Sequence, residues 1–78
     1  MRVTVDEVCR LVATQLGAEL VNEGDRLIED LGAESADVLN ILAVVEERWG
    51  VVIDDIEAAE IRTVGDVHRR ACEALKRD

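Results

Sequence analysis

Apolar residues recur at helical spacing at the start of the chain. They stand three or four residues apart from Val5 to Leu16, and Gly17 ends the series. Thr4 and Glu7 have the spacing of a capping box, in which the threonine hydroxyl and the glutamate each accept a backbone hydrogen bond. The pattern predicts a first helix over about residues 4–16.

A second helix is predicted from Ser35 to Trp49, with Gly50 as its end. Its apolar residues cover most of the circumference, so we expect other helices to enclose it on more than one side. These residues are Ala36, Val38, Leu39, Ile41, Leu42, Ala43, Val44, Val45 and Trp49. We expect only a narrow polar stripe to face water, formed by Asp37, Asn40, Glu47 and Arg48 with Val44 among them.

The rest of the chain predicts a long connection and two further helices. Residues 17–34 show no convincing period, and their expected anchors to the core are Leu20, Val21, Leu27, Ile28 and Leu31. A helix of one or two turns follows the Asp54–Asp55 pair and ends near Ile61. Thr63 then caps a last helix with a buried stripe at Val64, Val67, Ala71 and Leu75. The expected fold is a single all-α domain over residues 1–78, a small four-helix bundle of three main helices and one short one.

Charge narrows the range of partners. The net charge is −9, and residues 19–60 hold thirteen acidic and two basic residues, whereas the two ends together carry a net charge of +2. Such a chain repels nucleic acid and anionic membranes and favours basic protein surfaces. We find no membrane span, signal peptide or transit peptide in the sequence, so we expect a cytoplasmic protein, and a monomer.

Little in the sequence suggests catalysis or metal binding. His68 is the only histidine, and no residue supplies a convincing third member of a triad. Adjacent carboxylates point in different directions on a helix, and no twelve-residue window fits a calcium loop. Cys9 and Cys72 lack the spacing of a zinc site or a redox pair and are interpreted as small packed hydrophobic residues. We therefore expect neither an enzyme nor a metal site.

Ser35 can be interpreted in two ways. A serine at a helix start can cap the helix through its hydroxyl. It can also accept a phosphate-linked group, because the unsatisfied N–H groups and the positive dipole end of the helix favour a phosphate there. Gly32 and Ala33 leave the approach open, whereas Glu34 and Asp37 would repel an isolated phosphate.

The segment EDLGAESADVLNILAVVEERWGVVI, residues 29–53, resembles the modification region of acyl carrier proteins. Their aspartate-serine-leucine motif appears here as Glu34-Ser35-Ala36. The resemblance extends over nearly the whole chain, through Leu16-Gly17, Asp30-Leu31-Gly32, Glu46-Glu47, Trp49, Ile53, DDIEAAEI and Thr63-Val64.

The resemblance implies that Ser35 carries 4'-phosphopantetheine, transferred from coenzyme A by a phosphopantetheinyl transferase. The thiol of that group would hold acyl intermediates as thioesters and deliver them to enzymes of fatty-acid, polyketide or specialised lipid biosynthesis. Basic patches on those enzymes would meet the acidic region around the second helix. The expected partner contacts are Asp30, Glu34, Ala36, Asp37, Asn40, Val44, Glu46 and Glu47.

Departures from the family pattern keep two alternatives open. Ala36 replaces the usual leucine, Asn40 stands where fatty-acid carriers commonly have an acid, Arg48 interrupts an acidic cluster, and Asp54 replaces a frequent proline. These differences favour a specialised carrier. The alternatives are an aminoacyl or peptidyl carrier, and an unmodified acidic interaction domain in which Ser35 is only a helix cap.

Overall fold

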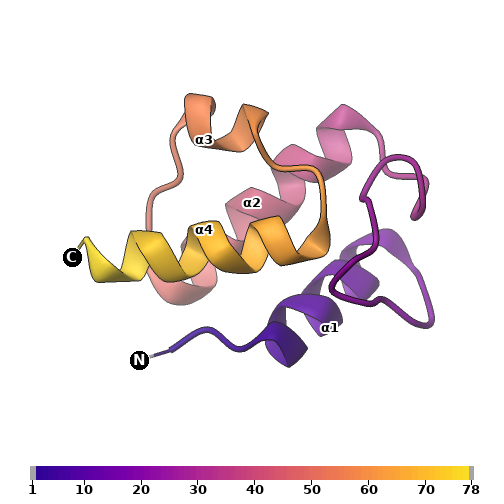
Figure 1. Cartoon of the computed structure of the whole chain (residues 1–78), viewed down its shortest axis with the longest axis horizontal. Helices are drawn as coiled ribbons and strands as arrows, with labels where there is room; N and C mark the ends of the chain where they lie inside the picture. The colour runs from indigo at the N-terminus through magenta and orange to yellow at the C-terminus, as the bar shows by residue number, and fades with distance from the viewer. Residues whose placement is uncertain (1, 78) are drawn as a thin grey trace.

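The computed structural model describes residues 2–77, which form four helices and no strand. They are α1 (Val5–Leu16), α2 (Ser35–Trp49), α3 (Asp55–Ala59) and α4 (Val64–Lys76). Figure 1 shows α3 as a short helix apart from the three long ones, with the long α1–α2 loop at the opposite end of the molecule from the two termini. The predicted all-α fold, with three main helices and one short one, is confirmed.

The predicted caps explain where α1, α3 and α4 begin. Thr4 forms the capping box with Glu7, and Thr63 forms an equivalent box with Asp66. The hydrogen bonds from the Thr4 backbone and hydroxyl hold the pKa of Glu7 below its usual value. Asp54 accepts from the backbone N–H of Glu57 at 2.8 Å and caps α3. Local sequence signals therefore set these boundaries.

A single aliphatic cluster joins the three long helices. Its members come from α1, α2, α4 and the loops between them. The fully buried ones are Val8, Val12, Leu27, Ile41, Val45, Val64, Val67 and Ala71. Cys9, Cys72 and Leu75 are half-buried and pack against this cluster, which agrees with the expectation that both thiols pack as small hydrophobic residues.

The α1–α2 loop is anchored by fewer residues than expected. Val21 and Leu27 are buried and Leu31 is half-buried, but Leu20 is 75% exposed and Ile28 50% exposed. The prediction was wrong at Leu20 and Ile28 because the loop turns their buried neighbours Val21 and Leu27 to the core and leaves these two side chains in contact with solvent. Backbone bonds from Leu27 N to Arg62 O at 2.9 Å and from Gly65 N to Glu23 O at 2.8 Å also tie the loop to the start of α4.

One side of α2 is open, contrary to the expectation that other helices enclose it. Ala36, Leu39 and Ala43 are exposed, Leu39 by 60%. The long helices α1 and α4 cover the inner side of α2, whereas α3 has only five residues and leaves the outer side uncovered. The exposed stripe of α2 therefore includes Ala36, Leu39 and Ala43, which were not in the predicted polar stripe. Val44, which was in it, is half-buried against the core.

Within residues 2–77, no helix has the length and apolar character needed to cross a bilayer.

Candidate functional site

Ser35 is the first residue of α2, and its side chain is exposed. The turn before it needs Gly32, whose φ of +73° is rarely adopted by other residues. Ala33 is buried, and its N–H donates to Leu27 O at 2.9 Å. Ala33 thus lies on the inner side of the turn, whereas Gly32 and Ser35 lie on the outside of the molecule.

Ser35 does not cap α2. The N-cap residue is Glu34, whose backbone N–H donates to Asp37 Oδ2 at 2.9 Å. Among the described residues, no hydrogen bond involves the Ser35 hydroxyl. Of the two interpretations, the cap is wrong because the helix begins one residue earlier than that role requires. The hydroxyl is therefore free to accept a group.

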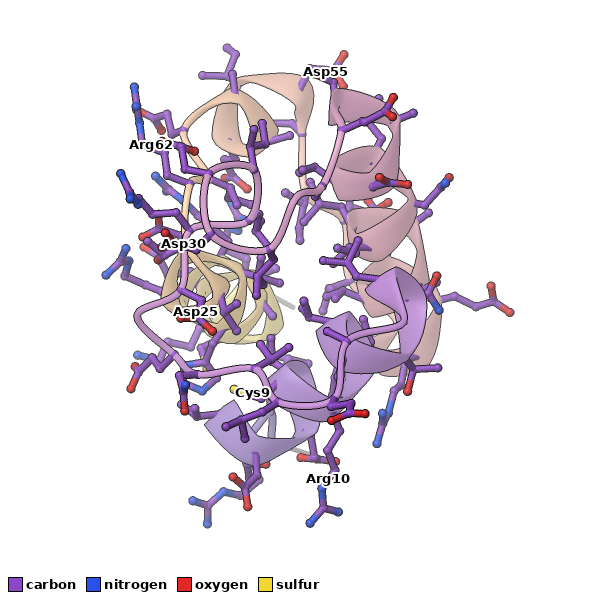
Figure 2. The ribbon with its side chains drawn as sticks, turned by 90° about the vertical axis from the view of Figure 1, so that its right-hand side faces the viewer. Cys9, Arg10, Asp25, Asp30, Asp55 and Arg62 are labelled. Atoms are coloured by element: carbon purple, nitrogen blue, oxygen red, sulfur yellow. The ribbon has the colours of Figure 1, made fainter. Side chains whose placement is uncertain are left out.

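An apolar hollow of about 410 Å³ adjoins Ser35. Its apolar lining comes from Ile28, Val38, Leu39, Ala58, Ala59 and Ile61. Ser35 and Asp55 contribute polar groups to its wall, and Figure 2 shows Asp55 at the end of the molecule formed by α3 and the start of α2. A group attached to Ser35 thus has helix N–H groups behind it and apolar surface beside it.

Besides Asp37, which accepts from the Glu34 backbone N–H, two more of the expected contact residues are engaged within the chain. Asp30 accepts from the Arg26 backbone N–H at 2.8 Å and from its guanidinium at 3.1 Å. These bonds hold the pKa of Asp30 below its usual value, and Arg26 offsets its charge. Glu46 accepts from Ile53 N at 2.9 Å and so fixes the segment after α2. Both carboxylates have structural roles.

The other expected contact residues divide by exposure. Asp37 and Val44 are half-buried, whereas Glu34, Ala36, Asn40 and Glu47 are exposed. Leu39 and Ala43 were missed as surface residues, although they lie four and eight residues after Ser35 and therefore on its face of the helix. We call Glu34, Ala36, Leu39, Asn40, Ala43 and Glu47 the outer face of α2.

Among residues 2–77, no histidine or cysteine lines the hollow beside Ser35. His68 is on α4, where its Nε2 is 3.0 Å from Val3 O. Within residues 2–77, no group of three or more His, Cys, Asp or Glu side chains is placed to hold a metal ion. The Ser35 hydroxyl is therefore accessible at the wall of this hollow, away from the one histidine of the chain.

We expect Ser35→Ala to change the free energy of unfolding by no more than about 0.5 kcal/mol, because alanine suits an exposed helical position. Asp37→Ala is the matched comparison. It removes the carboxylate that accepts from the Glu34 backbone N–H, and it should lower the free energy of unfolding by about 1 kcal/mol. Urea unfolding of both variants measures this difference. An equal loss in Ser35→Ala would show that its hydroxyl stabilises the helix after all.

Comparisons with known proteins agree with this geometry. The family described as "Phosphopantetheine attachment site" matches residues 6–70. An acyl carrier protein of Wolinella succinogenes is 42% identical over 66 residues, covering 82% of this chain and 87% of that protein. One of Chlamydia caviae is 39% identical over 64 residues, covering 80% and 83%.

Solved structures of similar proteins have the same fold. An acyl carrier protein of Thermotoga maritima superposes with a TM-score of 0.79 at 25% identity, over 94% of this chain and 87% of that one. The acetyl actinorhodin acyl carrier protein of Streptomyces coelicolor gives 0.80 at 26% identity, over 96% and 93%. The chain belongs to the acyl carrier protein family, whose members are non-enzymatic carriers with a phosphopantetheine attachment site.

Proposed function

We propose that Ser35 is the attachment point of 4'-phosphopantetheine and that residues 1–78 act as one carrier unit. The observation that carries the proposal is the exposed Ser35 hydroxyl, unused by any hydrogen bond at the start of α2 and inside the matched region. When attached, the group supplies a thiol that holds acyl intermediates as thioesters. The chain itself positions the group through the α2 terminus and offers apolar surface beside it.

The unmodified interaction domain is the weaker alternative. That hypothesis gave Ser35 the role of a helix cap, and the Glu34–Asp37 pair takes that role instead. Incubation with coenzyme A, magnesium and a broad-specificity phosphopantetheinyl transferase distinguishes the two hypotheses. The carrier gains the mass of one phosphopantetheine, and an unchanged mass would support the unmodified domain.

We infer that the chain carries fatty-acyl or polyketide intermediates. One of the similar structures is the acyl carrier protein of actinorhodin, and the similar sequences are named acyl carrier proteins without a stated cargo. The 410 Å³ hollow beside Ser35 supports an aliphatic cargo, because each buried methylene contributes about 0.8 kcal/mol. An aminoacyl cargo gains less from such a surface. Cytoplasmic location, monomeric state and specialisation towards one pathway stay predictions from the sequence.

We infer that the transferase and the acyl-processing enzymes bind the outer face of α2. It places the exposed Leu39 one turn from Ser35, with Glu34 and Glu47 towards its two ends. Carboxylates around an apolar residue suit a partner with an apolar pocket and a basic rim. The acids speed the encounter, and Leu39 supplies most of the buried contact.

Leu39→Ala tests this surface. We expect it to lower kcat/KM of the transferase for the apo protein by about ten-fold, because a buried leucine contributes roughly 1.5–3 kcal/mol. Leu20→Ala is the matched control, since Leu20 is 75% exposed but lies in the α1–α2 loop. Equal kcat/KM values for the Leu39→Ala and wild-type apo proteins would show that the transferase binds another surface.

A further inference from the structure

The short helix α3 forms one side of the hollow beside Ser35. It contributes Asp55, Ala58 and Ala59 to the lining of that hollow. A smaller hollow of about 210 Å³ shares several lining residues with the first, and Ala59 of α3 is among them. The position of α3 therefore sets the width of both hollows.

Apolar packing anchors the chain on either side of α3 but holds the helix itself weakly. Ile53 before the helix and Ile61 after it are each 8% exposed. Within residues 55–59 no side chain is buried, and the apolar group that packs against the core there is the methyl group of Ala58. A methyl group buries little apolar surface, so other interactions must contribute to the position of α3.

Two arginines in the C-terminal half of α4 bind carboxylates at the two ends of α3. Arg77 Nη1 and Nη2 donate to Glu57 Oε1 and Oε2 at 2.6 and 3.1 Å, and Arg70 Nη2 donates to Glu60 Oε1 at 2.9 Å. The bonds from Arg77 hold the pKa of Glu57 below its usual value. A bidentate pair contributes more than most surface ion pairs, and the Glu57 side chain is only 16% exposed. We call these two ion pairs the α3 latch.

We propose that the α3 latch, through Arg70 and Arg77, determines how well an acyl chain is shielded in the hollow beside Ser35. The inference rests on the proposed function, because the acyl chain is attached through Ser35. While the latch is closed, α3 keeps water from one side of the hollow. When the latch opens, α3 moves outward between its anchors Ile53 and Ile61, and a chain in the hollow meets solvent.

Hydrogen exchange of the unloaded chain tests the latch separately from the cargo. The backbone N–H groups of Ala58 and Ile61 donate to Asp54 O and Ala58 O at 2.9 and 3.2 Å, so their exchange reports the opening of α3. Arg77→Gln should speed exchange at these two amides about five-fold and leave the amides of α2 unchanged. Equal exchange in Arg77→Gln and the wild-type chain would overturn the proposal.

A double-mutant cycle shows whether the two partners act through one another. Glu57→Gln removes the other half of the same bond and should speed exchange as Arg77→Gln does. The combined variant should exchange no faster than either single variant, because both changes remove one interaction. Arg69→Gln is the matched control, since Arg69 pairs with Asp66 within α4, and it should exchange like the wild-type chain. Additive effects of Glu57→Gln and Arg77→Gln would contradict the latch.

Cleavage of the thioester by hydroxylamine tests the effect on the cargo. The transferase loads the apo chain from acetyl- or octanoyl-coenzyme A, and intact mass follows the loss of the acyl group. The combined Arg70→Gln and Arg77→Gln variant should lose its octanoyl group about five-fold faster than the wild-type chain. Acetyl groups bury too little apolar surface to depend on α3, so they should be cleaved at the same rate in both proteins.

Two outcomes separate this inference from the proposed function. Equal octanoyl cleavage in the variant and the wild-type chain, after both have gained the mass of the loaded group, would overturn the role of the latch in shielding. A wild-type chain that gains no mass on loading would contradict the proposed function instead. The exchange measurements use the unloaded chain, so they still decide whether Arg77 and Glu57 hold α3 in place.

Discussion

Replacing Ser35 by alanine is expected to abolish phosphopantetheine attachment completely. The wild-type chain, treated with coenzyme A, magnesium and the transferase, should gain one phosphopantetheine, and the Ser35→Ala chain should gain none. Ser35 is the only serine in the sequence, so a serine ester has no other position to occupy. Intact mass spectrometry measures the result directly.

The control for this experiment is Thr14→Ala, which removes an exposed hydroxyl from α1. It should be modified at the wild-type rate. Because the Ser35 hydroxyl makes no hydrogen bond within residues 2–77, the Ser35→Ala protein should remain folded. A mass gain in the Ser35→Ala protein would therefore show that a residue other than Ser35 carries the group.

Leu27→Ala should cause the largest loss of stability, about 2–5 kcal/mol. The Leu27 side chain is 1% exposed, its backbone N–H binds Arg62 O next to α4, and its carbonyl accepts from Ala33 within the loop. The loss is a large share of the roughly 5–15 kcal/mol that stabilises a small domain. It should also reduce loading of Ser35, since the turn through Ala33 positions that residue.

Leu20→Ala is the matched control for Leu27→Ala, with the same change in the same loop. Leu20 is 75% exposed, so its removal should shift the free energy of unfolding by less than about 0.5 kcal/mol. Urea unfolding of both variants gives the comparison. Equal losses would mean that the loop is not anchored as the structure shows.

Local signals were sufficient to predict the helices. Thr4 and Glu7 form the capping box that their spacing predicted, and Thr63 caps α4 as predicted. Gly17 and Gly50 end α1 and α2 in left-handed conformation. Each of these interactions joins residues at most five apart, so a single sequence contains the information. The family resemblance likewise followed from a continuous segment and agrees with the comparisons.

Tertiary arrangement limited the other predictions. An apolar residue on α2 is buried only where a neighbouring helix covers it, and the short α3 leaves Leu39 in solvent. Asp30 and Glu46 were predicted as partner contacts, but within the chain Arg26 binds Asp30 and the backbone of Ile53 binds Glu46. The cap of α2 shifted by one residue to Glu34, and this shift leaves the Ser35 hydroxyl available.

The most direct test of the carrier function is tandem mass spectrometry of the protein isolated from its own cells. We predict a phosphopantetheine phosphodiester on the peptide that contains Ser35, with an acyl group bound to its thiol as a thioester. The identity of that acyl group would also show which pathway the protein serves. An active protein whose Ser35 is unmodified in the cell would contradict the carrier function.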